Sequence, residues 1–238
     1  MKMNMNTYEF DGEKYKKASR HQREWGNSLI TELSLCGNEA ILDLGCGDGG
    51  VTEELAQSVP NGNVLGIDAS AGMVETAKQR KRDNLEFRQM DINDIEFENM
   101  FDVIFSNAAL HWVKDHTILL HSSFRALKEN GILLWDFAGD GNCSNFFAVV
   151  RDKIQSAKYE QYFQEFEWPW YMPAKADYEK LVAAAGFSSY DITEVNRDRY
   201  FADADEMISW IDQPSIVPFI STLPDEVKAD FREDVIRA

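Results

Sequence analysis

The residues with the clearest chemical meaning lie in one stretch, Asp43-Leu44-Gly45-Cys46-Gly47-Asp48-Gly49-Gly50. Glycine lets a backbone turn sharply and lets a ligand approach it closely. The apolar run 40–44 before the glycines predicts a buried parallel strand, and residues 51–56 after them begin a helical pattern. Because the start of a helix presents free backbone N–H groups, this stretch predicts a site for a nucleotide-like ligand.

Two classes of ligand fit the spacing of these glycines. Gly45, Gly47 and Gly50 match G-x-G-x-x-G, which binds dinucleotides when an acid such as Asp68 follows about twenty residues later. Asp43 stands two residues before Gly45, at the strand end, where a carboxylate can reach a cationic amine. A carboxylate there would repel a pyrophosphate, so the acid favours a cationic ligand.

Polar and aromatic residues follow two later strands of the pattern. Asp68 ends a strand predicted over 63–67, where its carboxylate can accept hydrogen bonds from both hydroxyls of a ribose. After a strand predicted over 101–105, the small residues Asn107-Ala108 leave room for a ligand. His111-Trp112 then present two large rings with polar edges. These positions extend the predicted site along one edge of a sheet.

A helix is predicted near the start of the chain, over about residues 14–33. Its apolar stripe includes Trp25 and Leu29, and Gln22 lies on the same stripe with Ser19 beside it. A polar residue on an inward face needs a hydrogen-bond partner. Gln22 is therefore either a satisfied core amide or a ligand contact, and the pattern leaves both open.

The order of elements defines the expected fold. Strands are predicted over 40–44, 63–67, 85–90, 101–105 and 132–137, with helices over 51–56, 71–81 and 115–128 between them. This alternation predicts a doubly wound parallel sheet, whose ligands lie outside the carboxyl ends of its strands. Two alternating segments, 187–195 and 199–201, predict closing strands. We therefore expect an α/β fold with a Rossmann-like doubly wound seven-stranded sheet, mostly parallel with an antiparallel last strand, plus a helical lid.

One segment departs from the alternation. Residues 140–172 have no strand pattern and are rich in aromatic side chains, and Trp168-Pro169-Trp170-Tyr171 cannot all face the core of one helix. We interpret this block as a lid over the ligand edge of the sheet, with ordinary packing of a helical insertion as the alternative. The expected organisation is a single domain over 1–238, with an N-terminal helical cap over 1–35 and a lid over 140–172.

Composition limits the functional classes. The chain has 238 residues, with 24 Lys and Arg against 41 Asp and Glu, so its net charge of −17 would repel nucleic acids and anionic membranes. The three cysteines are widely spaced and predict neither a disulfide framework nor a zinc site. The start of the chain lacks the apolar core of a signal peptide, and no run is long enough for a membrane span. We expect a cytoplasmic protein with no nucleic-acid or membrane partner.

Asp43, Gly45, Gly47 and Gly49 also form D-x-G-x-G-x-G, which resembles motif I of the class I methyltransferases that use S-adenosylmethionine. Within that family the chain resembles the group that contains trans-aconitate methyltransferase, malonyl-carrier-protein methyltransferase and juvenile hormone acid methyltransferases. The likeness spans nearly the whole chain. It is carried by Tyr15, Ser19, Gln22, the 43–49 loop, Gly66-Ile67-Asp68, Asp91-Ile92, Asn107-Ala108, Leu110-His111-Trp112, Tyr178, Leu181, Gly186-Phe187, Phe201 and Trp210.

The resemblance implies S-adenosyl-L-methionine as the cofactor and no metal. It places adenine at Asp91-Ile92. The full set expected to bind the cofactor is Tyr15, Asp43, Gly45, Cys46, Gly47, Asp68, Ala69, Met73, Asp91, Ile92, Asn107 and Ala108. The named relatives methylate carboxylates, which implies a small organic acid as the acceptor, although the 140–172 block varies too much within the group for the acid to be carried over.

A carboxylate acceptor is ionised near neutral pH, so transfer to it needs positioning but no general base. N–H donors on Gln22 and Trp112 would orient it, and His111 completes the residues expected in catalysis. An amine, phenol or carbon acceptor would need a base, for which His111 is the candidate. A nicotinamide-dependent oxidoreductase is disfavoured because no Tyr-x-x-x-Lys pair occurs, and a non-enzymatic binding module would leave the lid and rings without a task.

Overall fold

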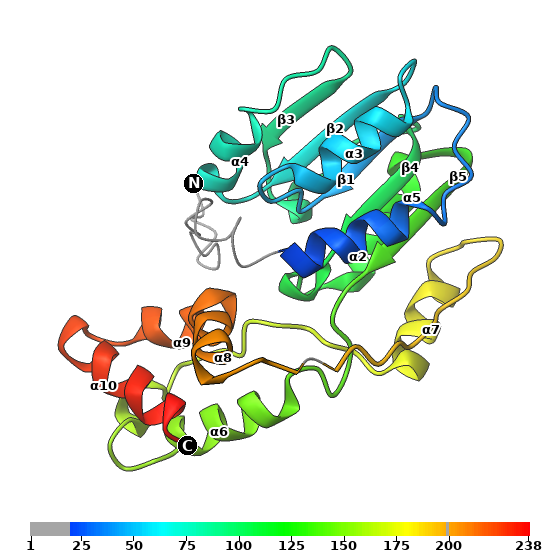
Figure 1. The fold of residues 1–238 in the computed structure, drawn as a ribbon. Coiled ribbons are helices and arrows are strands. Elements are labelled where there is room, and N and C mark those ends of the chain that lie inside the picture. Colours follow the sequence, from blue (N-terminus) through cyan, green and yellow to red (C-terminus); the bar gives the residue numbers. More distant parts are fainter. Residues whose placement is uncertain (1–19, 199) are drawn as a thin grey trace. The chain divides into compact units, whose positions relative to one another are not determined.

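The computed structural model describes residues 20–198 and 200–238, so the predictions for Tyr15 and Ser19 lie outside the described residues. The chain divides into two compact units (Figure 1). Unit 1 contains the described residues through Asp140 together with Trp170–Glu194, and unit 2 contains Gly141–Pro169 and Val195–Ala238. The expectation of a single domain with a cap and a lid stays a prediction.

Unit 1 is built on a five-stranded sheet in which every pair of neighbours is parallel. The strands are β1 (Ala40–Leu44), β2 (Asn63–Asp68), β3 (Leu85–Gln89), β4 (Phe101–Asn107) and β5 (Leu127–Asp136). Their order is β3-β2-β1-β4-β5, so the chain reverses direction across the sheet between β1 and β4. The predicted Rossmann-like α/β fold is confirmed, and the carboxyl ends of the two central strands lie side by side.

Helices cover both faces of this sheet. They are α2 (Arg20–Ile30), α3 (Gly50–Ser58), α4 (Ala71–Ala77), α5 (His116–Ala126) and α7 (Lys175–Ala184), with the 3-10 turns η1 (Ile92–Asp94) and η2 (Leu110–Trp112). Alternate residues of a strand point to opposite faces. On one face Ile41 packs with Leu29 of α2 and Leu55 of α3, and on the other Leu42 packs with Leu119 of α5. The core therefore has two layers of side chains, one on each side of β1.

Two helix boundaries differ from the sequence predictions. The Ser70 side chain caps α4 by accepting from Met73 N, but the helix ends at Ala77 rather than at residue 81. Helix α5 ends at Ala126 rather than at residue 128, because Leu127 already pairs with Phe101 in the sheet. Asn130, just past the predicted helix end, lies within β5 with a positive φ of 64°, where the register of β4 and β5 shifts.

The prediction of a sixth and a seventh strand was wrong for the part of the chain that the structure describes. Within residues 187–198 and 200–201 the structure has no strand, so the described sheet has five strands rather than seven and no antiparallel member. Part of this alternating pattern is exposed, with Val195 at 62% and Tyr200 at 89%, whereas Phe187 and Ile192 are half-buried against α7 and its neighbours without forming a strand. Since β propensity depends on a face that packs against neighbours, alternation alone does not fix a strand here.

Unit 2 is helical around an aromatic core. Its elements are α6 (Ser144–Ile154), the turn η3 (Glu160–Tyr162), α8 (Ala204–Trp210), the π-helical turn η4 (Ile211–Ser215), α9 (Val217–Thr222) and α10 (Asp225–Ile236). Phe231 of α10 is fully buried against Tyr159 and Phe163, at ring-centroid distances of 5.0 and 5.6 Å. The apolar face of α10, the last helix, closes this core.

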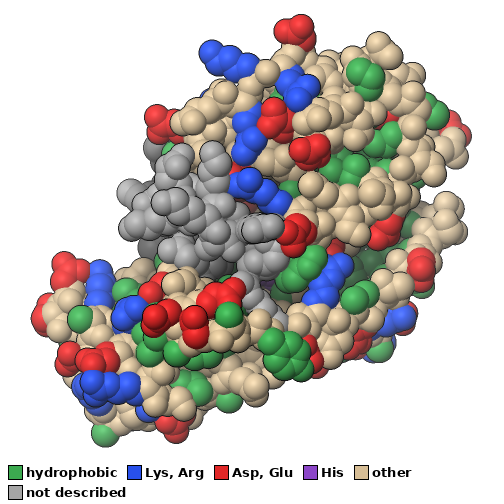
Figure 2. Space-filling view, viewed as in Figure 1, with side chains coloured by type: hydrophobic (Ala, Val, Ile, Leu, Met, Phe, Trp, Pro, Cys, Tyr) green, Lys and Arg blue, Asp and Glu red, His purple; other side chains and the backbone are tan. Residues whose placement is uncertain are grey.

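The surface is consistent with a strongly acidic chain. On the face drawn in Figure 2, acidic and basic side chains are interspersed over several elements. Among the described residues, no helix combines the length and the apolar character needed to cross a membrane.

Candidate functional site

The glycine loop, residues Gly45–Gly50, follows β1 directly. Gly45, Gly47 and Gly49 have φ values of 74°, 53° and 75°, in the left-handed region that favours glycine. The backbone N–H groups of Gly45 and Cys46 both donate to Ile67 O, at 2.9 Å each. The loop is therefore folded back over the end of β2, and its conformation depends on glycines at three positions.

Asp68 at the tip of β2 fixes the next part of this loop. One carboxylate oxygen accepts from Gly47 N and the other from Ser70 N, each at 2.9 Å. A Cβ added to Gly47 would meet no atom within 4 Å. The loop therefore presents an open side at Gly47, next to a carboxylate that retains further lone pairs for a ligand.

Asp43 is the buried acid of the site. Its side chain is 2% exposed, and one oxygen accepts from Thr52 Oγ1 of α3 at 2.7 Å. Burial, with a smaller contribution from the nearby Asp68, raises the pKa of Asp43 to about 7. Among the described residues no Lys or Arg pairs with this carboxylate. A cation brought close to Asp43 would therefore stabilise its ionised form.

Cys46 lies in the same loop and is 8% exposed. Burial, together with the charges of Asp68, Asp43 and Asp48, raises the pKa of its thiol well above the usual value. The side chain packs with Val74 and other apolar residues of α4 and β3. Cys46 is thus a small apolar component of the loop in its protonated form.

The ends of β1 and β4 lead into segments that approach each other closely. A Cβ on Gly45 would lie 2.2 Å from Ala109 Cβ, and Ile92 Cδ1 is 3.8 Å away. Ala108 beside it has a positive φ of 56°, and its N–H donates to Asp136 O at 2.7 Å. The glycine loop and the segment after β4 are therefore in contact, as predicted for residues at neighbouring strand ends.

Rings gather on the η2 turn that follows β4. The Trp112 ring lies 5.8 Å from the His111 ring and 5.2 Å from the Trp170 ring, measured between centroids. Tyr171 N donates to His111 O at 2.8 Å, so the segment 170–171 runs alongside the turn. The predicted lid block is thereby divided, since Trp170 belongs to unit 1 and Trp168 to unit 2.

His111 is positioned within this group of rings. Burial, and then the neighbouring His116, lowers its pKa to about 4, so the imidazole is neutral at pH 7. Its Nδ1 atom is buried and has no hydrogen-bond partner among the described residues. A neutral imidazole at this place can donate or accept one further hydrogen bond, depending on its tautomer.

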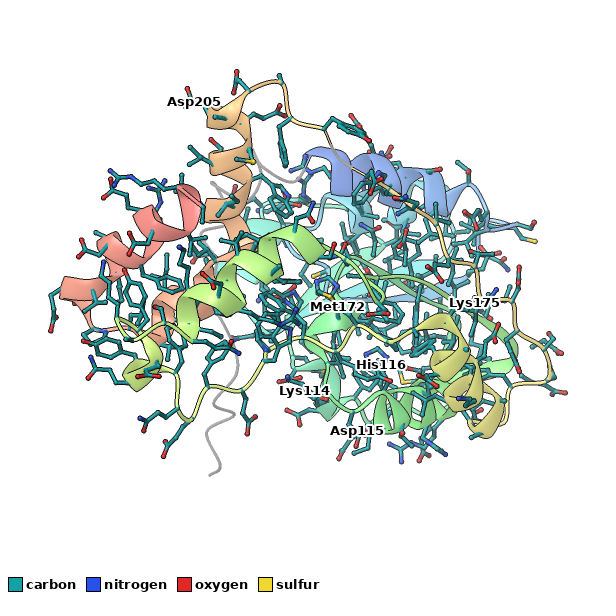
Figure 3. The ribbon with its side chains drawn as sticks, turned by 90° about the horizontal axis from the view of Figure 1, so that it is seen from below. Lys114, Asp115, His116, Met172, Lys175 and Asp205 are labelled. Carbon is teal, nitrogen blue, oxygen red and sulfur yellow. The ribbon has the colours of Figure 1, made fainter. Side chains whose placement is uncertain are left out.

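A second buried histidine, His116, binds the η2 turn. His116, labelled in Figure 3 at the start of α5, is 2% exposed and uses both ring nitrogens. Nε2 lies 2.9 Å from Leu110 O, and Nδ1 lies 3.0 Å from the Tyr178 hydroxyl of α7. Because a carbonyl only accepts, Nε2 carries the proton and Nδ1 accepts from the tyrosine. His116 therefore ties the η2 turn to α7.

Several predicted site residues lie together and others are not described. Asp43, Gly45, Cys46, Gly47, Asp68, Ile92, Asn107, Ala108, His111 and Trp112 all lie at the carboxyl edge of the sheet or in the loops that follow it. Ala69 O accepts from Gln89 Nε2 at 3.2 Å, and Met73 in α4 is 4% exposed. Asp91 caps η1 by accepting from Asn93 N. Gln22 lies in α2, but its side chain is outside the described residues, as is Tyr15.

Sequence reasoning missed four residues that shape the site. Thr52 donates to Asp43, and Arg23 pairs with Asp48 of the loop. His116 binds the η2 turn, which carries His111 and Trp112, and Tyr178 binds His116. Tyr178 was named only for its place in the resemblance. The helical periodicity that locates α5 and α7 carried no information on which of their polar side chains meet, so no sequence signal identified the His116–Tyr178 pair.

Comparisons with known proteins agree on one family. The model described as "Methyltransferase domain" matches residues 36–180. A trans-aconitate 2-methyltransferase of Deinococcus radiodurans is 31% identical over 190 residues, which cover 77% of this chain and 71% of that protein. A malonyl-[acyl-carrier protein] O-methyltransferase of Bacillus cytotoxicus is 34% identical over 131 residues, but the match covers 53% of this chain and only 46% of that protein.

Among solved structures, a phosphoethanolamine N-methyltransferase of Haemonchus contortus superimposes with a TM-score of 0.63. The match covers 98% of this chain and 54% of that one, with 18% sequence identity. At this identity the likeness concerns the fold alone.

Proposed function

This chain belongs to the methyltransferase domain family and is an S-adenosylmethionine-dependent methyltransferase, and we propose that it methylates the carboxylate of a small organic acid. The family follows from a profile match over 36–180 and from the relative that is 31% identical. The names of two relatives, which refer to trans-aconitate and to a malonyl group, support the carboxylate.

The loop fits this cofactor better than a dinucleotide. S-adenosylmethionine carries a sulfonium methyl group, which it donates to a nucleophile, and its amino acid part carries an ammonium group. Asp43 is a buried carboxylate whose pKa of about 7 a cation would lower, whereas a pyrophosphate would be repelled. We propose that Asp43 faces the cationic part, that Asp68 accepts from the ribose hydroxyls, and that Gly47 leaves the space open.

The observation that carries the carboxylate proposal is the state of His111. Its pKa of about 4 makes this buried imidazole a weak proton acceptor. General base catalysis works best when the pKa of the base lies near the working pH. An acceptor that is already ionised needs no proton removed, and a carboxylate meets this condition at neutral pH.

The residues around the η2 turn would then orient the acceptor rather than activate it. The Trp112–Trp170 pair, at 5.2 Å, provides a rigid apolar wall that excludes water. The indole N–H of Trp112 and an N–H donor on His111 or Gln22 would hold the carboxylate oxygens. Transfer by in-line displacement depends mainly on this positioning.

A methyl-transfer screen tests the proposal. Purified protein is incubated with labelled S-adenosylmethionine and separate panels of small carboxylic acids, amines and phenols. We expect label in acids alone, as base-labile esters. Trp112→Phe keeps the ring and removes its N–H, so turnover of the acid should fall about 10-fold or more while S-adenosylhomocysteine affinity changes little. Trp135→Phe, the same change inside β5, serves as the control. Label in amines or phenols alone would refute the carboxylate proposal.

The second candidate is transfer to an amine, phenol or carbon centre with His111 as the base. The buried Nδ1 of His111, which has no partner among the described residues, is the observation in its favour. His111→Ala would then abolish turnover, and the native rate would rise with pH as this base loses its proton. Under the carboxylate proposal, the rate stays flat above the pKa of the acid.

The lid over 140–172 stays part of the proposal for how water is excluded. Its aromatic content supports this role, since Phe147 and Trp168 pack edge to face at 5.0 Å. Hydrogen exchange in 141–169 should slow when an acid that is methylated is added with S-adenosylhomocysteine. Exchange that slows only in the glycine loop would make the block ordinary packing.

A further inference from the structure

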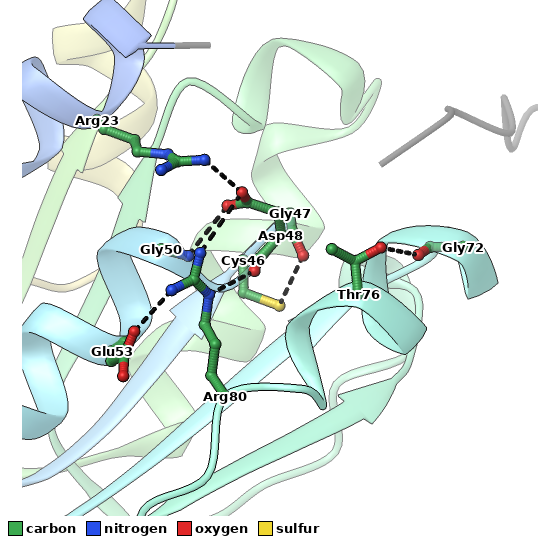
Figure 4. Close-up of polar contacts among 9 residues, drawn as sticks. All are labelled: Arg23, Cys46, Gly47, Asp48, Gly50, Glu53, Gly72, Thr76 and Arg80. Atoms are coloured by element: carbon green, nitrogen blue, oxygen red, sulfur yellow. Dashed lines mark hydrogen bonds and ion pairs between the residues drawn. The ribbon is translucent and has the colours of Figure 1, made fainter. Parts of the chain in front are cut away.

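An ion-pair network joins helix α2 to the glycine loop (Figure 4). Arg23 Nη2 of α2 donates to Asp48 Oδ2 at 2.6 Å, and Asp48 is 6% exposed. The other Asp48 oxygen accepts from Gly50 N at 3.0 Å, which fixes the carboxylate at the start of α3. One residue of the loop thus binds both its own backbone and the neighbouring helix.

A second arginine holds the loop from the opposite side. Arg80 Nε donates to Asp48 O at 2.9 Å, and Arg80 Nη1 donates to Glu53 Oε2 of α3 at 2.6 Å. These partners belong to the loop, to α3 and to the segment after α4. Within this network Arg23 alone comes from α2, so a change at Arg23 leaves the loop with Arg80 as a partner.

Two glycines allow α2 to approach this closely. A Cβ on Gly26 would lie 2.7 and 2.9 Å from the two methyl groups of Val51, so the backbone of α2 rests directly on the start of α3. A Cβ on Gly50 would lie 3.2 Å from Arg23 Nε. Gly50 has no positive φ, so its lack of a side chain serves the packing of the guanidinium rather than a turn. A glycine inside a helix costs about 1 kcal/mol against alanine, and close packing is a reason to keep it.

We propose that Arg23 is a positioning residue that couples the docking of α2 to the cofactor-binding form of the glycine loop. Asp48 lies between Gly47, the open position of the loop, and Gly49, so a shift of the loop moves the carboxylate that Arg23 binds. Cofactor binding therefore stabilises docked α2, and docked α2 raises cofactor affinity by the same factor. The proposal rests on the cofactor alone and does not depend on the acceptor.

The coupling has a functional consequence because α2 also carries Gln22, next to Arg23 in sequence. A helix that docks when the loop is filled would bring the acceptor side of the site into place only after the cofactor has bound. Arg23 then links the two halves of the site without touching the reacting atoms.

The test measures binding and hydrogen exchange rather than turnover. Calorimetry with S-adenosylhomocysteine gives affinity, and exchange of α2 amides is followed with and without this ligand. In the native protein the ligand should slow exchange in both α2 and the glycine loop. In Arg23→Gln affinity should fall about 5- to 10-fold, with slowing kept in the loop and lost in α2. Arg23→Lys, which keeps the charge, should recover part of both effects.

Three further variants define the pair. Asp48→Asn keeps the oxygen that accepts from Gly50 N and removes the charge that pairs with Arg23 and, at 3.7 Å, with Arg80. It should therefore lower affinity at least as much as Arg23→Gln, and the double variant should be no worse than Asp48→Asn alone. Gly26→Ala changes no charge, and by pressing on Val51 it should also abolish the α2 response. Arg232→Gln removes a guanidinium that binds Asp212 at 2.6 Å in unit 2, and it is the control.

Two results would overturn the proposal. One is native α2 exchange that does not respond to S-adenosylhomocysteine. The other is an Arg23→Gln variant in which S-adenosylhomocysteine still slows hydrogen exchange in α2, whatever happens to affinity. Arg23 would then affect the cofactor only through its charge and not through the docking of α2.

Discussion

The glycine loop and the η2 turn follow neighbouring strands of one sheet and touch at Gly45 and Ala109, yet different forces hold them. The loop is held by polar contacts to backbone, with Asp68 accepting from Gly47 N and Ile67 O from two loop amides. The turn is held by packed rings, with Trp112 against Trp170, and by two hydrogen bonds, from Tyr171 N to His111 O and between His116 Nε2 and Leu110 O. The loop is therefore fixed by directional bonds to its backbone, whereas aromatic packing contributes much more to the turn.

This contrast separates the expected effects of mutation. A hydrogen-bonded loop loses its shape when one acceptor is removed, because the orphaned N–H groups cost free energy. A packed turn tolerates changes of ring type that keep volume. Changes in the loop should therefore alter cofactor affinity, and changes beneath the turn should alter acceptor kinetics.

The strongest test removes the contact between the two regions. In Gly45→Ala the new Cβ would lie 2.2 Å from Ala109 Cβ, and the φ of 74° adds strain. We expect S-adenosylhomocysteine affinity to fall about 30-fold or more, since an overlap with near-rigid atoms commonly costs about 1–3 kcal/mol in addition to about 1–2 kcal/mol of strain. Gly141→Ala, at φ 80° with no atom within 4 Å, controls for strain alone. Similar losses in both variants would show that the contact is unimportant.

The next test removes the acid that holds the loop. Asp68→Ala leaves Gly47 N and Ser70 N without their acceptor, so we expect cofactor affinity to fall by about 1.5–3 kcal/mol, or roughly 10- to 100-fold. Calorimetry measures the affinity, and thermal unfolding measures stability. Asp102→Ala is the control, because Asp102 accepts from Ala40 N at 2.7 Å at the opposite end of the sheet. Equal loss of affinity in the two variants would assign the effect to global stability.

A change at the buried acid Asp43 should raise the stability of the protein, whereas the two changes above should impair it. Because the pKa of Asp43 is about 7 in the fold and near 4 when unfolded, the fold holds a proton that the unfolded chain has lost between these pH values. Stability therefore falls as pH rises from about 4 to 7 and the loss persists above. Asp43→Asn should stabilise the cofactor-free protein by about 2 kcal/mol at pH 8, and little near pH 4.

The same variant should bind S-adenosylhomocysteine more weakly, so stability and function oppose each other at this position. Chemical denaturation at the two pH values measures the first effect and calorimetry the second. The exposed Asp83→Asn is the control for charge. A variant that is destabilised at pH 8 would mean that Asp43 has a cationic partner beyond the described residues.

The smallest effect is expected from a change at Tyr178, whose hydroxyl binds the histidine that holds the η2 turn. Tyr178→Phe removes the hydroxyl that donates to His116 Nδ1 and should cost about 1 kcal/mol of stability. Because His116 also binds Leu110 O, kcat/KM for the acceptor should fall a few-fold, while cofactor affinity stays unchanged. Tyr190→Phe, at an exposed tyrosine, is the control. A loss of cofactor affinity instead would contradict the separation of the two regions.

Sequence patterns predicted the glycine loop better than the η2 turn, because the loop depends on local backbone requirements and the turn depends on contacts between distant residues. Gly45, Gly47 and Gly49 were identifiable because left-handed backbone needs glycine, and this requirement is local in sequence. Strands β1 and β4 were identifiable because buried parallel strands are near-continuous apolar runs, whereas β5 begins at Leu127, five residues before its predicted start, and is largely exposed there. In contrast, Trp170 meets Trp112 across 57 intervening positions, a long-range contact that no periodicity encodes. The failed strands at 187–201 show the same limit, since alternation does not supply the neighbour that a strand requires.

Cys46 shows how the loop avoids a chemical hazard. A methyl sulfonium is an alkylating agent, and a thiolate is a stronger nucleophile toward it than a carboxylate. Burial and the charges of Asp68, Asp43 and Asp48 hold the pKa of the Cys46 thiol well above its usual value, so the sulfur stays protonated at neutral pH. Since the thiolate and not the thiol attacks electrophiles, burial, with the nearby acids, keeps this sulfur in its less reactive form toward a sulfonium.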